Sequence, residues 1–331
     1  MSDPVEELLA ELAASPPAPG APRRTLLTGW FSFRDGEVTA GDVLALRRVE
    51  QALERAGVPF ETAWSPGFAP EALSLDAVDP GAFSHLVFVC GPAHGPQVVG
   101  LHERFAGCRR IAVDVSVVSG RDPAVAGFDA VLTRDGGGAP PRVDLSAHAP
   151  GQAPPPVVAV VLTSGQGEYR GRRRHDDVSD ALTEWLRGTD CARLPLDTRL
   201  ATDDWRLCAT PEQYLAVVRR TDLVVTTRLH GLVLALRAGV PALAVDPVAG
   251  GAKVWAQARA CRWPAALLPE EVSPATLRAW WSWCLSPRGR GAAVRRERWL
   301  RRGRLPEAAE AVAGTGGAGD GPGAVALLPH R

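Results

Sequence analysis

Short apolar runs alternate with longer stretches of mixed polarity from residue 25 onward. Apolar runs of this length, bounded by polar or turn residues, are typical of buried strands. In the first half of the chain they lie at 25–30, 58–64, 85–91, 109–118 and 128–133. Between the first two runs, residues 39–57 show the apolar spacing of a helix that ends at Gly57. The alternation predicts βα units around a largely parallel sheet.

A second alternating series follows a stretch rich in proline and glycine, Ala139–Pro156, near the middle of the chain. Such a stretch is typical of an interdomain linker. The strands predicted beyond it lie at 157–163, 191–196, 222–227 and 241–246. The predicted helices lie at 176–188, 210–220, 230–239 and 274–286. We therefore expect an α/β protein with two doubly wound Rossmann-like domains that face a cleft, as in the GT-B arrangement.

The expected domains are residues 23–150 and 151–286. Residues 1–22 combine a short amphipathic stretch with the sequence SPPAPGAP, which cannot propagate a helix, and predict a flexible N-terminal arm. Residues 287–312 predict a basic C-terminal helix. Residues 313–331 are too rich in glycine to pack and predict a disordered tail.

The amino-acid composition limits the classes of function and the location that we expect for the protein. The 37 basic and 37 acidic residues give no net charge, so there is no electrostatic reason to expect nucleic-acid binding. Neither a membrane-spanning run nor a signal sequence is recognisable, which favours a cytoplasmic protein. The six cysteines are scattered without metal-ligand spacing, and we expect them to be reduced and structural. Arginine has replaced lysine everywhere except at Lys253, a bias that we attribute to a GC-rich bacterial genome.

An arginine and a histidine interrupt the mostly apolar stretch Thr221–Asp246. Arg228 and His230 stand where a predicted strand ends and a helix begins, and their spacing lets both project the same way from extended chain. Arginine offers a planar fork to a carboxylate or phosphate, and histidine exchanges a proton near neutral pH. One interpretation is therefore acid–base chemistry on an anionic substrate. The other is an arginine paired to a domain-interface carboxylate and a histidine that caps the helix.

The sequence DLVVTTRLHGLVLALRAGVPALAVD, with Lys253 after it, closely resembles the C-terminal signature of the polysaccharide pyruvyl transferase family. In that signature a strand that ends in Arg-Leu-His is followed by a helix, a Gly-x-Pro turn, a second strand and a lysine. The resemblance covers Asp222–Lys253, and the turn is Gly239-Val240-Pro241. The sequence DPVAGGAK places Lys253 further from Asp246 than the usual arrangement.

The resemblance implies transfer of pyruvate from phosphoenolpyruvate, the donor substrate, to two hydroxyls of a sugar, which gives a cyclic ketal and phosphate. Arg228 and Lys253 are then expected to bind the donor, and His230 to protonate its methylene carbon. Arg170 or Arg172, in the sequence GEYRGRRR, could supply a third cation, although a solvated basic loop would also explain this run. The scheme requires neither a metal nor a cofactor.

Weaker similarities to the same family extend into the first half of the chain. Gly41 and Asp42 correspond to the Gly-Asp motif that opens the family's first helix, and Arg134-Asp135 to its strand ending in Arg-Asp. Asp42 could equally be a simple helix cap. The first strand lacks the usual Gly-Asn turn, and the second glycine-rich turn reads FVCGP, with Cys90 in it. These loops are expected to form the acceptor side, and the second domain the donor side.

Two other functions stay open. One is a GT-B-type glycosyltransferase that uses a nucleotide sugar, and the other is a non-catalytic member of the fold that binds glycans or scaffolds a complex. The basic segment Arg288–Arg304 is interpreted either as a solvated helix or as a contact with an anionic membrane surface or lipid-linked acceptor. The expected partners are phosphoenolpyruvate and a sugar or glycan acceptor. The sequence predicts neither the acceptor's identity nor the oligomeric state.

Overall fold

The computed structural model describes residues 3–16, 23–138, 140–163 and 167–302. The chain divides into two compact units, Met1–Gln152 and Ala153–Arg331, which we call unit 1 and unit 2. The division falls inside the stretch Ala139–Pro156, where the sequence predicts a linker.

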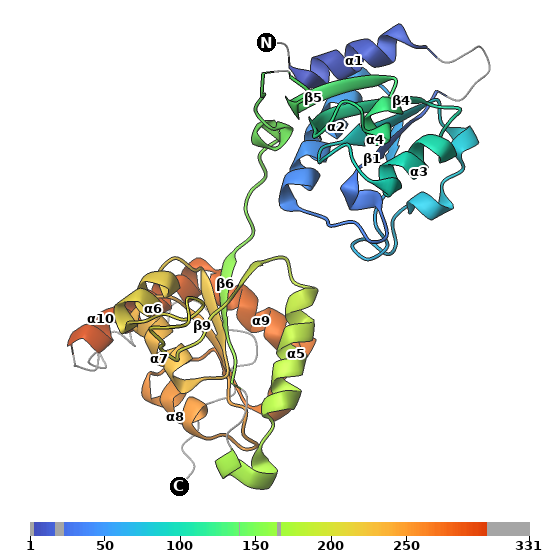
Figure 1. Ribbon diagram of the computed structural model, residues 1–331. Coiled ribbons are helices and arrows are strands. Elements are labelled where there is room, and N and C mark those ends of the chain that lie inside the picture. The colour runs from blue at the N-terminus through green and yellow to red at the C-terminus, as the bar shows by residue number, and fades with distance from the viewer. Residues whose placement is uncertain (1–2, 17–22, 139, 164–166, 303–331) are drawn as a thin grey trace. The chain divides into compact units, whose positions relative to one another are not determined.

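Unit 1 is built on a five-stranded sheet in which all pairs are parallel (Figure 1). In spatial order the strands are β2 (Phe60–Thr62), β1 (Thr25–Thr28), β3 (His85–Val89), β4 (Arg109–Val117) and β5 (Ala130–Gly136). Because β2 and β3 flank β1 on opposite sides, the chain reverses its direction across the sheet between β1 and β3. Open α/β sheets bind ligands at such a reversal, beyond the carboxyl ends of the strands.

Helices cover both faces of this sheet. Among the described residues of this unit, the α-helices are α1 (Pro4–Ala14), α2 (Ala40–Ala56), α3 (Pro96–Arg104) and α4 (Pro123–Ala126). Side chains of α1 and α2 share one core cluster with Leu27 and Val87 of the strands. Side chains of α3 and α4 share another with Leu26 and Phe88. Adjacent strand residues point to opposite faces, so the two clusters lie on opposite sides of the sheet.

The N-terminal helix corrects one expectation. Residues 4–14 form part of unit 1 instead of a flexible arm, because Val5, Leu8 and Leu12 recur at helical spacing and are buried against the sheet. Glu11 also pairs with Arg109 of β4 at 2.6 Å. Of the proline-rich sequence in this region, residues 17–22 lie outside the described residues.

Unit 2 repeats the same strand topology in a second parallel sheet. In spatial order the strands are β7 (Ala192–Pro195), β6 (Val157–Val161), β8 (Leu223–Thr226), β9 (Ala242–Val245) and β10 (Ala266–Leu267). The reversal therefore lies between β6 and β8. The expected α/β fold with two Rossmann-like domains is confirmed.

Six helices accompany this sheet among the described residues: α5 (His175–Arg187), α6 (Pro211–Val218), α7 (Leu229–Arg237), α8 (Lys253–Ala260), α9 (Pro274–Leu285) and α10 (Pro287–Arg302). An aromatic contact joins α9 to α5. The ring centroid of Trp281 in α9 lies 5.3 Å from that of Trp185 in α5. The basic helix expected at 287–312 is observed as α10, and the part beyond residue 302, like the predicted tail, lies outside the described residues. No helix in the described ranges is both long and apolar enough to cross a membrane.

Candidate functional site

The arginine of the Arg-Leu-His triplet lies at the reversal of the unit 2 sheet. β8 ends at Thr226 and α7 begins at Leu229, so Arg228 occupies the N-cap position in an extended conformation (φ −104°, ψ 137°). Thr226 fixes this turn, because its hydroxyl Oγ1 accepts the backbone N–H of Arg228 at 2.9 Å. The buried strand and the helix start therefore determine where Arg228 lies.

The Arg228 guanidinium contacts three neighbouring segments. Its Nε donates to the Leu162 carbonyl at 3.0 Å, and one terminal nitrogen donates to Thr198 Oγ1 at 3.3 Å. The same nitrogen lies 3.5 Å from Asp197 Oδ1. Burial opposes ionisation of Asp197, but hydrogen bonds from Arg199 and the charge of Arg228 outweigh it and lower the pKa of this carboxyl. The carboxylate partner of Arg228 therefore belongs to unit 2 itself.

His230 is exposed and lies in the first turn of α7. The helix begins one residue earlier than the sequence predicts, so His230 is helical and does not continue the extended chain of Arg228. Leu229, between the two, packs against the core of unit 2. The N–H groups at this helix start form a positive end that favours anions.

Lys253 begins α8, immediately after the loop that follows β9. Asp246 holds this loop, because its Oδ2 accepts the backbone N–H groups of Ala252 and Trp255, both at 2.8 Å. The Lys253 Nζ lies over the Tyr169 ring, 5.9 Å from its centroid. Lys253 and Arg228 thus follow two adjacent strands of the sheet, β9 and β8.

Arg170 and Arg172 lie between β6 and α5. The guanidinium of Arg172 donates to the Ala249 carbonyl at 3.0 and 2.8 Å and to the Gly251 carbonyl at 2.8 Å. It therefore ties its own loop to the loop that carries Lys253. Arg170 is exposed and has φ 45° and ψ −128°, a strained conformation for a residue with a side chain.

Unit 1 contains a pocket of about 450 Å³ at the carboxyl ends of β1 and β3. Three residues predicted from the sequence, Gly41, Asp42 and Arg134, line it together. The other lining residues are Trp30, Glu37, Thr39, Cys90, Gly91, Pro92 and Asp144. The pocket therefore occupies the reversal of the first sheet, as Arg228 does that of the second.

Asp42 caps α2 and also faces the pocket. Its Oδ2 accepts the backbone N–H of Thr39 at 3.3 Å, while Thr39 Oγ1 accepts the backbone N–H of Asp42 at 3.2 Å. These two bonds form a capping box, so the helix-cap interpretation of Asp42 is correct. A substrate contact by Asp42 or Gly41 stays a prediction.

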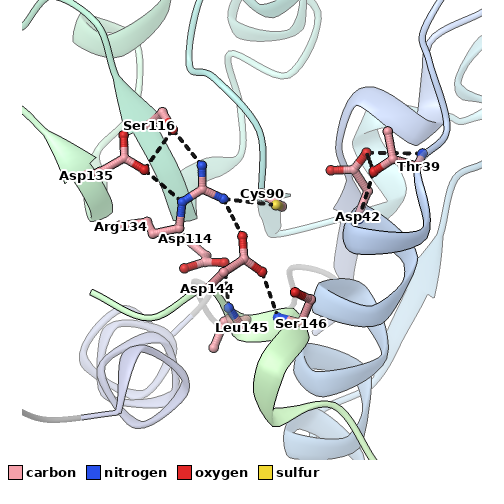
Figure 2. A network of polar contacts seen from close by, with 10 residues as sticks. All are labelled: Thr39, Asp42, Cys90, Asp114, Ser116, Arg134, Asp135, Asp144, Leu145 and Ser146. Atoms are coloured by element: carbon pink, nitrogen blue, oxygen red, sulfur yellow. Dashed lines mark hydrogen bonds and ion pairs between the residues drawn. The ribbon is translucent and has the colours of Figure 1, made fainter. Parts of the chain in front are cut away.

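Arg134 is the centre of a polar network at the pocket (Figure 2). Its Nε donates to Asp135 at 2.8 Å, one terminal nitrogen to Asp144 at 2.5 Å and the other to Ser116 at 2.7 Å. Burial lowers the pKa of Arg134, but its acidic neighbours outweigh burial and raise it, so the guanidinium is permanently charged. Asp144 lies in the predicted linker and belongs to no motif, so nothing in the sequence indicates its place in this network.

The turn FVCGP shapes the pocket wall. Gly91 has φ +73°, and a Cβ atom there would lie 2.4 Å from Trp30 Cδ1. The indole Nε1 of Trp30 donates to the Pro92 carbonyl at 3.0 Å. Glycine is therefore required at position 91 for the indole to lie against this turn.

Comparison with solved structures gives low-scoring similarities. The spinosyn forosaminyltransferase SpnP is 13% identical, with 89% of this chain and 98% of that chain covered and a TM-score of 0.33. The spinosyn rhamnosyltransferase SpnG, complexed with thymidine diphosphate, is 11% identical, with 84% and 96% covered and a TM-score of 0.31. The UDP-GlcNAc 2-epimerase of Methanocaldococcus jannaschii is 11% identical, with 84% and 99% covered and a TM-score of 0.28. No curated protein matches the chain.

A segment of unit 2 matches a known protein family. Residues 193–247 match the family described as polysaccharide pyruvyl transferase. The matched segment runs from β7 through the Arg228 turn to the residues after β9. Lys253 and the similarities noted in unit 1 lie outside it. The resemblance seen in the sequence is thus confirmed for residues 193–247, which are similar to the polysaccharide pyruvyl transferase family.

Proposed function

We propose that the protein transfers pyruvate from phosphoenolpyruvate to two hydroxyls of a sugar or glycan acceptor. The observation that carries this proposal is the place of Arg228. It lies inside the family match and also at the reversal of the unit 2 sheet, where α/β proteins bind anionic ligands. Phosphoenolpyruvate carries a carboxylate and a phosphate, which require cations in fixed positions.

The proposed donor site uses residues that follow adjacent strands. Arg228 is fixed by the Leu162 carbonyl and by Thr198, and its guanidinium has five N–H donors in all. Lys253 supplies a compact positive charge at the start of α8. Arg172 holds the Lys253 loop through the Ala249 and Gly251 carbonyls, so its role in this scheme is to position Lys253.

The chemistry then needs one proton donor. His230 delivers a proton to the methylene carbon of phosphoenolpyruvate while an acceptor hydroxyl adds to C2 and releases its own proton. The C2–O bond to phosphate breaks, and the second hydroxyl closes the ketal with loss of another proton. The products are the cyclic pyruvate ketal and inorganic phosphate. The helix start at Leu229 stabilises the departing anion.

Calorimetric titration of the full chain tests the donor. Phosphoenolpyruvate is expected to bind, and Arg228→Ala to weaken that binding at least tenfold because it removes a charge-assisted fork. Arg237→Ala is the matched control, since Arg237 is exposed in the last turn of the same helix, and its affinity should equal that of the wild type. Binding of a nucleotide sugar, with no binding of phosphoenolpyruvate, would instead support the glycosyltransferase alternative.

A further inference from the structure

Three potential metal ligands converge beside the unit 1 pocket. The sulfur of Cys90 and one carboxylate oxygen each of Asp114 and Asp144 all lie within 4.8 Å of one another, and in the described part of the chain no other group of three histidine, cysteine or acidic residues does so. They come from the end of β3, from β4 and from the segment after β5. Figure 2 shows them grouped around the Arg134 guanidinium.

Asp114 is the unusual member of this group. Its side chain is completely buried, and its Oδ2 accepts the backbone N–H of Leu145 at 2.9 Å. No described residue bonds to its buried Oδ1. Asp114 lies at an irregularity of β4, with φ +60°, where the β4–β5 register shifts. A buried carboxylate oxygen without a partner is costly unless something binds it.

The Arg134 guanidinium supplies the positive charge beside these three side chains. One terminal nitrogen is 2.5 Å from Asp144 and 3.6 Å from the Cys90 sulfur. Its other nitrogens are held separately by Asp135 and Ser116. Because the guanidinium is a rigid plane held by these two bonds, it is the Asp144 carboxylate that must turn away from it to bind a cation. Asp42 adds further negative potential at Cys90, so acidic groups outnumber this single arginine.

We propose that Cys90, Asp114 and Asp144 bind a thiophilic divalent cation of the Zn²⁺ type. A thiolate and two carboxylates form a ligand set that suits Zn²⁺, which accepts sulfur and oxygen ligands in tetrahedral sites. Because Cys90 and Asp144 line the pocket, the fourth position would be open to a water or to a hydroxyl of a bound molecule.

Binding of the cation to Cys90 releases one proton to the solvent. Cys90 is a buried free cysteine, and its thiol must lose a proton to form a bond to the metal. The cation displaces that proton to solvent, forms the sulfur–metal bond and takes up the second oxygen of Asp114. The Asp144 carboxylate then exchanges its bond from the Arg134 nitrogen for the cation, while Arg134 keeps its bonds to Asp135 and Ser116. The site belongs to unit 1 alone and does not depend on pyruvyl transfer.

Cobalt titration tests the site directly. Co²⁺ is added to the tag-free full-length chain, and a thiolate-to-cobalt absorption band that saturates at one equivalent and disappears on addition of Zn²⁺ is expected. Cys90→Ala should abolish the band, and Asp114→Asn should weaken cobalt binding by at least about tenfold. Cys108→Ala is the matched control, because Cys108 is also a buried free thiol of unit 1. Circular dichroism checks that each variant is folded.

Arg134→Gln gives a second, opposite test. If the guanidinium competes with the cation, removing its charge should tighten cobalt binding; equal or weaker binding would contradict the competition. Absence of a stoichiometric thiolate band in the wild-type protein would overturn the site, as would a band that persists in folded Cys90→Ala. Because phosphoenolpyruvate is absent from these titrations, their failure would leave the proposed transferase function unaffected.

Discussion

Arg228 Nε donates to the carbonyl of Leu162 at 3.0 Å, and this one bond joins the segments that follow β8 and β6 on either side of the sheet reversal. The arginine is therefore positioned by its own unit before any ligand binds. Such pre-organisation reduces the entropy lost on binding. The turn that carries Arg228 is also closely packed, because Gly231 lies against Thr226.

Gly231→Ala should disturb both stability and the site. A Cβ atom at position 231 would lie 2.2 Å from Thr226 Oγ1, the atom that accepts the Arg228 backbone N–H. We expect a loss of about 1–3 kcal/mol in the free energy of unfolding, the usual cost of overpacking. Denaturant unfolding followed by circular dichroism measures it.

Gly100→Ala is the control for that substitution. Gly100 lies inside α3, and nothing is within 4 Å of a Cβ atom built there. Alanine at this position should therefore stabilise the protein by about 0.5–1 kcal/mol. Equal effects of the two substitutions would show that Gly231 is not required for close packing.

The sequence predicted the parallel sheets well, because each buried strand is a continuous apolar run between turn residues. Local signals also located α2, whose N-terminal cap and final Gly57 are both observed. The sequence does not reveal that α1 belongs to unit 1, because this depends on burial of Leu8 against a sheet formed by distant residues. The two-residue strand β10 has too short an apolar pattern to be recognised.

The two sites differed in how far the sequence could reveal them. Arg228 was recognisable because strand end, triplet and helix start are contiguous in the chain. The group around Arg134 was recognised only in part. Asp114 belongs to it through an irregular strand backbone and a bond from Leu145, and Asp144 through a contact with Arg134. No local pattern encodes contacts of this kind.

Leu8→Ala should show that α1 is part of the unit 1 core. Leu8 is fully buried, so its truncation is expected to cost about 2–5 kcal/mol of unfolding free energy. Leu9→Ala, at a partly buried position of the same helix, is the control and should cost clearly less. Thermal or denaturant unfolding measures both. Near-zero effects of both substitutions would favour the flexible arm that the sequence suggested.

His102 should make unit 1 less stable in acid. Burial lowers the pKa of His102 from 6.5, and the charge of Arg110 lowers it further. The hydrogen bond to the Ala124 carbonyl and the charge of Asp129 raise the pKa, but they do not outweigh burial. The unfolded chain then binds the proton more readily, so the contribution of the neutral ring is present above about pH 6.5 and is lost as the pH falls below it. We expect wild-type stability to fall more than that of His102→Gln between about pH 7.5 and 5.5. Parallel curves for the two proteins would contradict this.

His230→Gln and Arg228→Ala should impair the proposed reaction in different ways. Glutamine keeps a hydrogen-bonding group at an exposed position of the first turn of α7 but cannot deliver the proton. Turnover is therefore expected to fall roughly 10²- to 10⁴-fold, with phosphoenolpyruvate affinity little changed. Arg228→Ala should weaken donor affinity directly. Calorimetry with phosphoenolpyruvate gives the affinities, and phosphate release with an acceptor gives the rates.

The two roles are separable because the two side chains differ in their surroundings. Arg228 is held by Leu162 and Thr198, so its loss removes a fixed charge, whereas His230 is exposed and its replacement leaves those contacts intact. A His230→Gln protein with near-wild-type turnover would refute the role of His230 as the general acid. A His230→Gln protein that has lost donor affinity as severely as Arg228→Ala would show instead that the histidine binds the anion.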